Sequence, residues 1–352
     1  MVATGQRGAQ GNGIYRLKSD CHPQFHVVKQ SLMKTLTRRD FVRRTSGMIV
    51  AGGLLSQTQL LAQAGAAPQA RRAIRLGGPV FGKFDDPEAL ALAHRKAGYS
   101  AAYCPGVSLK DTDRIRAFSA AFAKHDVVLA EVGRWVNLME TDGEKRKKNI
   151  ETVTDGLALA EAIGARCCVD IAGSFSSTSW FGPHADNFTQ AYFDAAVENA
   201  RKIIDAVKPK RARFTYEMMG WARPDTADEY LKLIKAVDRE AFAVHLDPCN
   251  AVNSPEKFYH NTALLNDCFD KLGRWIMSCH AKDLAWQVEM NVHFVEVIPG
   301  RGVLDYTTYL KRLSALPQNP PLMLEHLANE KEYEQGRKYI VETGQKAGLS
   351  FA

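Results

Sequence analysis

RFTYEMMGWARPDTADEYLKLIKAVDREAFAVHLD is the sequence of residues 213–247, and it holds an apolar strand, an amphipathic helix and a second apolar strand. Residues 213–218 and 243–246 are short apolar runs that predict buried strands. Between them, Asp225 and Thr226 can accept hydrogen bonds from the free N–H groups at the start of a helix. A strand, a helix and a strand in this order predict one unit of an α/β fold with parallel strands.

The same alternation runs from residue 74 to the end of the chain without a break in composition. The predicted strands are Ile74–Val80, Ala101–Cys104, Val127–Val132, Cys167–Ile171, Arg213–Met218, Ala243–Leu246, Ile276–Ala281 and Leu322–His326. The helical patterns are Pro87–Ala97, Thr112–Lys124, Arg146–Ile163, Phe188–Val207, Thr226–Val237, Thr262–Leu272, Tyr306–Leu316 and Glu330–Gly348. Eight such units predict a closed (β/α)8 barrel, a TIM barrel, as a single domain over residues 71–352.

The alternative for this pattern is an open, doubly wound sheet, which usually carries a glycine-rich phosphate loop after an early strand. The nearest candidate loop is GGPVFG at residues 77–82. It contains Pro79 and matches GxGxxG poorly. The sequence therefore favours the barrel.

An export signal precedes the barrel. Residues 37–44 read TRRDFVRR, a twin-arginine pattern, and are followed by the apolar run 47–55 and by small residues at 62–66 where a signal peptidase could cut. The apolar run is too short and too rich in glycine to span a bilayer stably. We expect a disordered extension over residues 1–32 and a twin-arginine signal peptide over residues 33–70. The protein would then be periplasmic or secreted, and the twin-arginine export machinery would be a partner.

The positive charge of the chain belongs to this leader. The net charge is +7, from 46 Lys and Arg against 39 Asp and Glu, but nine of the basic and only two of the acidic residues lie in residues 1–70. The remainder holds 37 of each and is neutral. This balance argues against a nucleic-acid partner. The sequence predicts no stable membrane anchor and leaves the oligomeric state open, a homo-oligomer included.

Four consecutive predicted strands end in an acidic residue or a histidine, namely Glu217, Asp247, His280 and Glu325. The active site of a TIM barrel lies at the C-terminal ends of its strands. Three carboxylates that converge in one lumen repel each other strongly, and a divalent cation removes that repulsion. Three carboxylates and one imidazole suit a single divalent metal, with Mn²⁺ as the first choice and Mg²⁺, Co²⁺ or Zn²⁺ as alternatives.

This set of four residues resembles the metal quartet of the xylose-isomerase-like sugar isomerases and epimerases. His280-Ala281-Lys282-Asp283 is similar to that family's HxKD signature on the seventh strand. Residues 299–306, PGRGVLDY, are similar to its PGxG-x-x-DY segment before the last helix. The resemblance covers roughly residue 74 to the end of the chain.

The resemblance implies a mechanism. In the ketose 3-epimerase branch of this family, the two metal-bound glutamates on strands five and eight take up and return a proton at carbon. Carried over, Glu217 and Glu325 would be the acid–base pair, and Asp247 and His280 would be ligands only. A metal ion that polarises a carbonyl acidifies the neighbouring C–H bond, and a carboxylate can then exchange that proton.

Other side chains near the strand ends are candidates for substrate contacts. His245 shares a strand face with Asp247, and Lys282 shares one with His280, so both are catalytic candidates. The substrate-binding candidates are Glu131 at the end of the third predicted strand and, on the expected loops, Trp135, His184, Trp221 and Arg301. His184 lies in the long polar loop 173–186, a length typical of lids and binding loops.

Several functions share this scaffold. The leading hypothesis is a metal-dependent isomerase or epimerase that removes a proton beside a metal-bound carbonyl of a non-phosphorylated sugar, because sugar phosphates are mainly intracellular. A lyase or hydratase that acts on 3-keto-glycosides by β-elimination, with His184 or His245 as base, shares the same first step. An endonuclease of the same barrel family would need additional histidine ligands on the early strands, which are missing here, and a non-catalytic sugar-binding barrel is disfavoured by the intact ligands.

Overall fold

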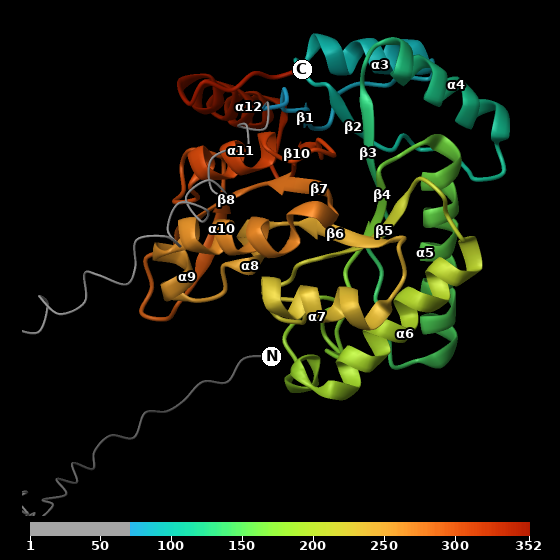
Figure 1. Ribbon diagram of the computed structural model, residues 1–352, viewed down its shortest axis with the longest axis vertical. Coiled ribbons are helices and arrows are strands. Elements are labelled where there is room, and N and C mark those ends of the chain that lie inside the picture. Colours follow the sequence, from blue (N-terminus) through green and yellow to red (C-terminus); the bar gives the residue numbers. More distant parts are fainter. Residues whose placement is uncertain (1–70) are drawn as a thin grey trace, which may run out of the picture. The chain divides into compact units, whose positions relative to one another are not determined.

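The computed structural model describes residues 71–352, which form a closed barrel of eight parallel strands surrounded by helices (Figure 1). The strand order around the barrel is β1-β10-β7-β6-β5-β4-β3-β2. The strands are β1 (Leu76–Gly77), β2 (Ala101–Tyr103), β3 (Val128–Gly133), β4 (Cys167–Asp170), β5 (Arg213–Glu217), β6 (Phe242–Leu246), β7 (Ile276–Ala281) and β10 (Leu322–Leu324). The predicted TIM barrel is confirmed, whereas the predicted leader lies outside the described residues.

Each barrel strand is followed by a helix. These helices are α3 (Pro87–Lys96), α4 (Thr112–Lys124), α5 (Gly143–Ile163), α6 (Gln190–Val207), α7 (Ala227–Val237), α10 (Asn261–Leu272), α11 (Tyr306–Ser314) and α12 (Glu330–Lys346). Most begin at a side chain that accepts a backbone N–H; Thr226, for example, caps α7 through Glu229 N. The cap also explains why α5 starts three residues earlier than predicted, since Asp142 accepts from Glu144 N and Lys145 N. No helix of the described residues is long and apolar enough to cross a membrane.

Four short helical elements were not predicted from the sequence. The helices α8 (Pro248–Ala251) and α9 (Pro255–Tyr259) follow β6, and two short 3₁₀ turns lie at Ala185–Phe188 and Gly273–Trp275. These segments are too short to show helical periodicity in the sequence. Helix α8 nevertheless matters for the site, because Asp247 is its N-cap and accepts from Asn250 N.

A two-stranded antiparallel hairpin, β8 (Asp283–Trp286) and β9 (Phe294–Val297), is inserted after β7. Its base is held by Asp283, whose carboxylate accepts from the backbone N–H groups of Leu284, Gly300, Gly302 and Leu304. A Cβ atom at Gly302 would lie 2.2 Å from Asp283 Oδ1, so only glycine fits there. The aspartate of the HxKD signature and the glycines of the PGxG segment therefore form one structural unit.

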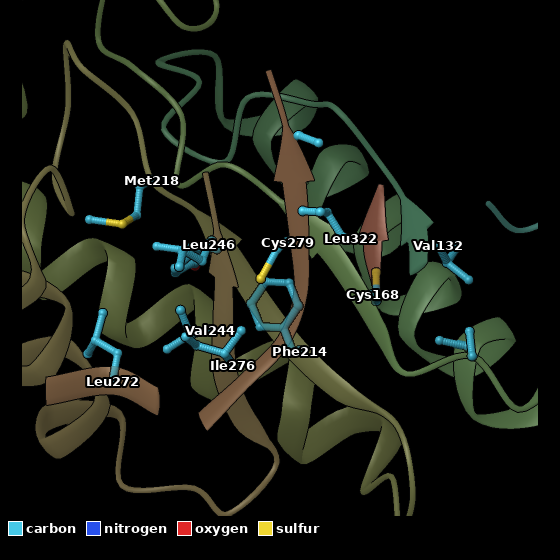
Figure 2. Close-up of a cluster of buried hydrophobic side chains, with 14 of the residues drawn as sticks. Val132, Cys168, Phe214, Met218, Val244, Leu246, Leu272, Ile276, Cys279 and Leu322 are labelled. Carbon is cyan, nitrogen blue, oxygen red and sulfur yellow. The ribbon is translucent and has the colours of Figure 1, made fainter. Parts of the chain in front are cut away.

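Side chains alternate between the two sides of the barrel wall. In β6, Val244 and Leu246 belong to the large core between strands and helices, together with Cys279 of β7 (Figure 2). His245 and His280, their chain neighbours, are fully buried and contact each other, with ring centroids 4.1 Å apart. The barrel interior is thus polar on the side of β6 and β7.

One small part of the interior is apolar. Ala101, Ala130 and Met323 form a separate small cluster contributed by β2, β3 and β10. The side chain of Met323 fills the space beside Gly77, where a Cβ atom would lie 2.5 Å from its sulfur.

Two irregularities in strand register change which residues face the interior. Ala102 pairs with Leu129 but Tyr103 pairs with Glu131, so the alternation slips by one residue in β3. A similar slip between β6 and β7 aligns His245 with Ser278. Bulges of this kind redirect a side chain locally. Their effect here is that Glu131 and Ser278 meet, with Ser278 Oγ donating to Glu131 Oε2 over 2.7 Å.

One buried histidine on α3 makes stability depend on pH. His94 packs against the rings of Tyr99 and Phe122, and its Nδ1 has no hydrogen-bond partner. Burial lowers the pKa of His94 from 6.5 to about 4. Above pH 6.5 the ring is neutral in both states, whereas between pH 6.5 and about 4 only the unfolded chain binds the proton. Stability is therefore lost as pH falls through this window.

The substitution His94→Leu is expected to remove this loss. Between about pH 7 and pH 4 the parent protein should lose up to about 3 kcal/mol of unfolding free energy that the variant retains. Urea unfolding of both proteins at several pH values measures the difference, because all other titrating groups are shared. Parallel pH profiles of the two proteins would contradict the assignment.

Candidate metal centre

The four predicted ligands meet at the C-terminal end of the barrel. Glu217 is the last residue of β5, Asp247 follows β6, His280 lies in β7, and Glu325 follows β10. One ligand atom from each lies within 4.8 Å of all the others. Nδ1 of His280 is 2.8 Å from Glu325 Oε1, 3.2 Å from Glu217 Oε1 and 3.5 Å from Asp247 Oδ2. We call these four residues the quartet.

The quartet fits a divalent cation. Asp247 Oδ2 and Glu325 Oε1 are buried and receive no hydrogen bond of acceptable geometry, although both lie close to the ammonium group of Lys282. Buried carboxylate oxygens without hydrogen bonds are costly unless a cation satisfies them. A donor set of three carboxylates and one imidazole matches the ligands that Mn²⁺, Mg²⁺, Co²⁺ and Zn²⁺ accept.

Lys282 is the cation that the chain itself supplies to the quartet. Its Nζ lies 2.7 Å from Asp247 Oδ2, 3.0 Å from Glu325 Oε1 and 3.9 Å from Glu217 Oε1. Burial opposes the charge, but the attraction of Asp247 and Glu325 raises the pKa of Lys282 well above its ordinary value. One ammonium against three carboxylates leaves two negative charges, which is the charge that one divalent cation balances.

The two glutamates of the quartet have different surroundings. Glu217 Oε1 accepts a hydrogen bond of 2.8 Å from Asn250 Nδ2, and burial raises the pKa of Glu217 because the charges of His280 and Lys282 offset only part of it. Around Glu325 burial also acts to raise the pKa, but His280 and Lys282 outweigh it and lower the pKa to about 2. The two carboxyl groups are therefore electrostatically distinct.

Glu131 supports His280 from below. Its Oε1 lies 3.1 Å from His280 Nε2, and its Oε2 lies 2.9 Å from His245 Nε2. Burial alone would raise the pKa of Glu131, but the two imidazoles and their hydrogen bonds lower it far below its ordinary value. An ionised Glu131 accepts the Nε2–H of His280, which leaves the lone pair of Nδ1 facing the quartet. Glu131, predicted to contact substrate, borders the cavity, and both of its oxygens also accept hydrogen bonds from protein side chains.

His245 and Lys282, the other catalytic candidates, differ in position. His245 is fully buried beside His280, and its Nε2 is occupied by Glu131, so its ring does not reach the cavity above the quartet. Lys282 does line that cavity. It also donates to Asn250 Oδ1 over 3.0 Å, and this amide connects it to Glu217.

A cavity of about 1470 Å³ opens above the quartet and is lined by loops from all eight strands. Trp135 and Trp221, two of the predicted substrate-binding residues, line it. Trp135 lies over Gly133, where a Cβ atom would come within 2.7 Å of its Nε1, and its ring faces His280 at a centroid distance of 6.3 Å. A large aromatic side chain thus stands directly beside the quartet.

Two predicted substrate-binding residues lie elsewhere. His184 caps a 3₁₀ turn through Asp186 N and packs edge-on against Phe175. Arg301 donates to Gln335 of α12. Among the described residues that line the cavity, neither His184 nor Arg301 is present. Loop side chains have no periodicity that fixes their direction, so the sequence could not place these two residues.

Three polar residues beside the quartet were missed by the sequence analysis: Asn250, Glu296 and His326. Nδ1 of His326 lies 2.8 Å from Glu296 Oε2, and its Nε2 lies 3.7 Å from Glu325 Oε2. The hydrogen bond to Glu296 raises the pKa of His326. Glu296 belongs to β9, and Asn250 belongs to α8, two elements that were not predicted. Of the three, only His326 could have been found from the sequence, because it follows Glu325 at the end of a predicted strand.

The substitution Glu131→Gln tests the support of His280. Loss of the carboxylate charge is expected to weaken Mn²⁺ binding by about 10- to 100-fold, the usual cost of losing a group that orients a ligand. Titration calorimetry of the metal-free chain with Mn²⁺ measures the affinity. The matched control is Asp170→Asn, because Asp170 is also fully buried but bonds to the backbone N–H groups of Val136 and Ile171 instead. Equal affinities in both variants would show that Glu131 does not orient His280.

Several solved structures share this fold. Endonuclease IV from Thermus thermophilus aligns with a TM-score of 0.58 and 16% identity, over 77% of this chain and 99% of that chain. D-psicose 3-epimerase with D-tagatose from Clostridium cellulolyticum aligns with a TM-score of 0.55 and 14% identity, over 76% and 95%. The apo form of 3-keto-D-glucoside 4-epimerase from E. coli aligns with a TM-score of 0.54 and 12% identity, over 76% and 98%. At these identities the likeness is one of fold.

A comparison with curated protein sequences finds no match. The family model described as xylose isomerase-like TIM barrel, in contrast, matches residues 93–343, which is most of the described barrel. This match includes all four residues of the quartet. The chain belongs to the xylose isomerase-like TIM barrel family.

Proposed function

We propose that the protein is a divalent-metal-dependent isomerase or epimerase that moves a proton at a carbon beside the carbonyl of a non-phosphorylated sugar. The observation that carries the proposal is the division of the quartet. Glu217 and Glu325 line the cavity, whereas Asp247 and His280 lie beneath it. Two members can therefore reach a substrate and two can only hold a cation.

A divalent cation held by the quartet would polarise a substrate carbonyl and acidify the neighbouring C–H bond. Glu217 and Glu325 are the groups that can take the proton from carbon and return it, since carboxylates within reach of the reacting carbon exchange protons efficiently. Lys282 and Asn250 hold the two glutamates in place, through the contacts of 3.0 Å and 2.8 Å already described. Trp135 lies beside His280 at this end of the cavity.

An uncharged sugar suits the cavity. A phosphate group is usually recognised by free arginine or lysine side chains or by a helix N-terminus. Among the described residues that line the cavity, the two that carry a permanent positive charge are Arg134 and Lys282, and Lys282 is already neutralised by the quartet. The twin-arginine pattern, outside the described residues, supports the same substrate class by suggesting a periplasmic or secreted location.

A lyase or hydratase that acts on 3-keto-glycosides is the second candidate. It begins with the same proton abstraction but also needs an acid for the departing oxygen. His184 and His245, the bases considered from the sequence, do not line the cavity, whereas His326 does and lies 3.7 Å from Glu325. His326 would serve as that acid.

The site gives less support to the endonuclease hypothesis. Among the described residues, the groups able to bind a metal are the quartet and the set Glu131, His245 and His280, which share His280. In the second set, Glu131 is hydrogen-bonded to both histidines, His245 and His280. This set includes no further histidine from the early strands. It does not provide the extended cluster that the endonuclease hypothesis requires.

Substitution of either cavity-lining glutamate tests the chemistry. Glu217→Gln and Glu325→Gln are each expected to slow the exchange of substrate hydrogen with D₂O by about 100-fold or more, because a carboxylate is lost from the proton transfer. Proton NMR of a panel of ketoses with Mn²⁺ measures the exchange. The control is Glu296→Gln, the same change at the same cavity but outside the quartet. Undiminished exchange in Glu325→Gln would refute the assigned role.

Metal removal tests the quartet separately. Dialysis against EDTA should lower the melting temperature of the chain, and Mn²⁺ should restore it, since a ligand present at about 100-fold above its Kd adds roughly 3 kcal/mol to stability. For a domain of this size that is several degrees. The variant Asp247→Asn should gain little from Mn²⁺. A melting temperature that does not respond to either EDTA or Mn²⁺ would exclude a metal at the quartet.

A further inference from the structure

Three large aromatic side chains line the outer part of the cavity and remain exposed. Trp180 and Phe181 belong to the loop after β4 and are 37% and 46% exposed, and Trp221 belongs to the loop after β5 and is 58% exposed. The rings of Trp180 and Phe181 meet at right angles, with centroids 5.3 Å apart. We call these three residues the aromatic wall. Large exposed apolar groups in a cavity usually mark a binding surface.

A buried amide joins the two loops that carry the wall. Asn187 is fully buried, and its Nδ2 donates to Gly182 O over 3.1 Å and to Trp221 O over 3.0 Å. Gly182 directly follows Phe181, so one side chain holds the backbone of both loops. The N–H of Phe175 in turn donates to Asn187 Oδ1 over 3.0 Å. The wall is therefore built into the structure by specific hydrogen bonds.

The cavity is larger than a single sugar ring needs. Its volume of about 1470 Å³ exceeds the roughly 300–1,000 Å³ of ordinary small-molecule pockets. The ring that reacts must lie at the inner end, against Glu217 and Glu325, with Trp135 beside it. One ring in that place leaves the outer part of the cavity, with the aromatic wall, without a partner.

We propose that the aromatic wall is a second subsite, which takes the outer ring of a glycoside whose inner ring lies over the quartet. This inference rests on the proposed function and narrows its substrate class from free monosaccharides to glycosides whose inner ring carries a carbonyl, as a reducing-end sugar or a keto sugar does. Aromatic faces carry partial negative charge and attract the polarised C–H groups of a sugar face or the edge of an aryl group. The three side chains of the wall offer few hydrogen-bonding groups, so the wall would select a ligand for the presence of a second ring. The arrangement of the sugar hydroxyl groups would be recognised at the inner end of the cavity.

Binding measurements with matched sugar pairs test the subsite. The full chain is titrated calorimetrically, in the presence of Mn²⁺, with glucose and cellobiose, with galactose and lactose, and with glucose and phenyl β-glucoside. At least one two-ring member should bind tighter than its one-ring partner. The substitution Trp221→Ala should lower the affinity for that two-ring ligand by about three- to tenfold, as expected for one lost aromatic contact. It should change the affinity for the one-ring partner by less than about twofold.

The chain offers a matched control in Trp286. This tryptophan is 51% exposed, close to the 58% of Trp221, but lies on the β8–β9 hairpin outside the cavity lining. Trp286→Ala should leave all affinities unchanged. Phe181→Ala provides a second variant of the wall and decides the test if Trp221→Ala is poorly folded.

Two results would overturn the inference. One is that the one-ring and the two-ring sugar of every pair bind with equal affinity. The other is that the wall variants lose affinity equally for the one-ring and the two-ring sugar. Neither result depends on turnover, so the binding experiment can refute the subsite without refuting the proposed function. Selective two-ring binding without hydrogen exchange in any sugar would remove the proposed function, whereas exchange that requires Glu325 without two-ring selectivity would remove only the subsite.

Discussion

The repulsion among three buried carboxylates is the constraint on which the site depends. Glu217, Asp247 and Glu325 have oxygens within a few ångströms of each other at one end of the barrel, where their burial limits screening by water. Charges at such distances repel strongly in a low-dielectric environment. Lys282 supplies part of the opposing charge, and a divalent cation would supply the rest. The fold brings the four strand ends together, but this balance of charge decides whether the arrangement is stable.

The same constraint explains the layer beneath the quartet. A neutral imidazole must turn its Nδ1 lone pair toward the cation site, so its Nε2 must carry the proton. Glu131 secures this orientation by accepting from Nε2 of His280. It is itself held by His245 and Ser278, which are buried and do not reach the cavity. His245 and Ser278 therefore act on the site through Glu131 and His280.

The sequence revealed the quartet because two simple regularities coincide there. Strand ends of a TIM barrel converge, and side chains two apart share a face, so Glu217, Asp247, His280 and Glu325 could be placed without coordinates. Glu131 was expected at this end of the barrel and borders the cavity, but its contacts with His245, Ser278 and His280 could not be predicted, because they depend on a slip in register that no periodicity in the sequence records.

Loops and short inserted elements account for the other differences. Glu296 and Asn250 lie on a hairpin and on a four-residue helix, and neither element is long enough to show a pattern. His184 and Arg301 lie on the loops where they were expected, but their side chains bond locally to Asp186 N and to Gln335. A backbone path limits where a loop residue lies, whereas its side-chain direction depends on the neighbours that it meets in the folded state.

The two glutamates that line the cavity are not interchangeable, and this asymmetry follows from what each one contacts. Lys282 Nζ lies 3.0 Å from Glu325 but 3.9 Å from Glu217, whose closest polar neighbour is the neutral amide of Asn250 at 2.8 Å. One carboxylate is therefore tied to a fixed positive charge and the other to a hydrogen-bond donor that tolerates either protonation state. The proposed movement of a proton between two faces of a carbon would need one group that readily stays ionised and one that can hold the proton. The different partners of Glu325 and Glu217 provide these two environments within one quartet.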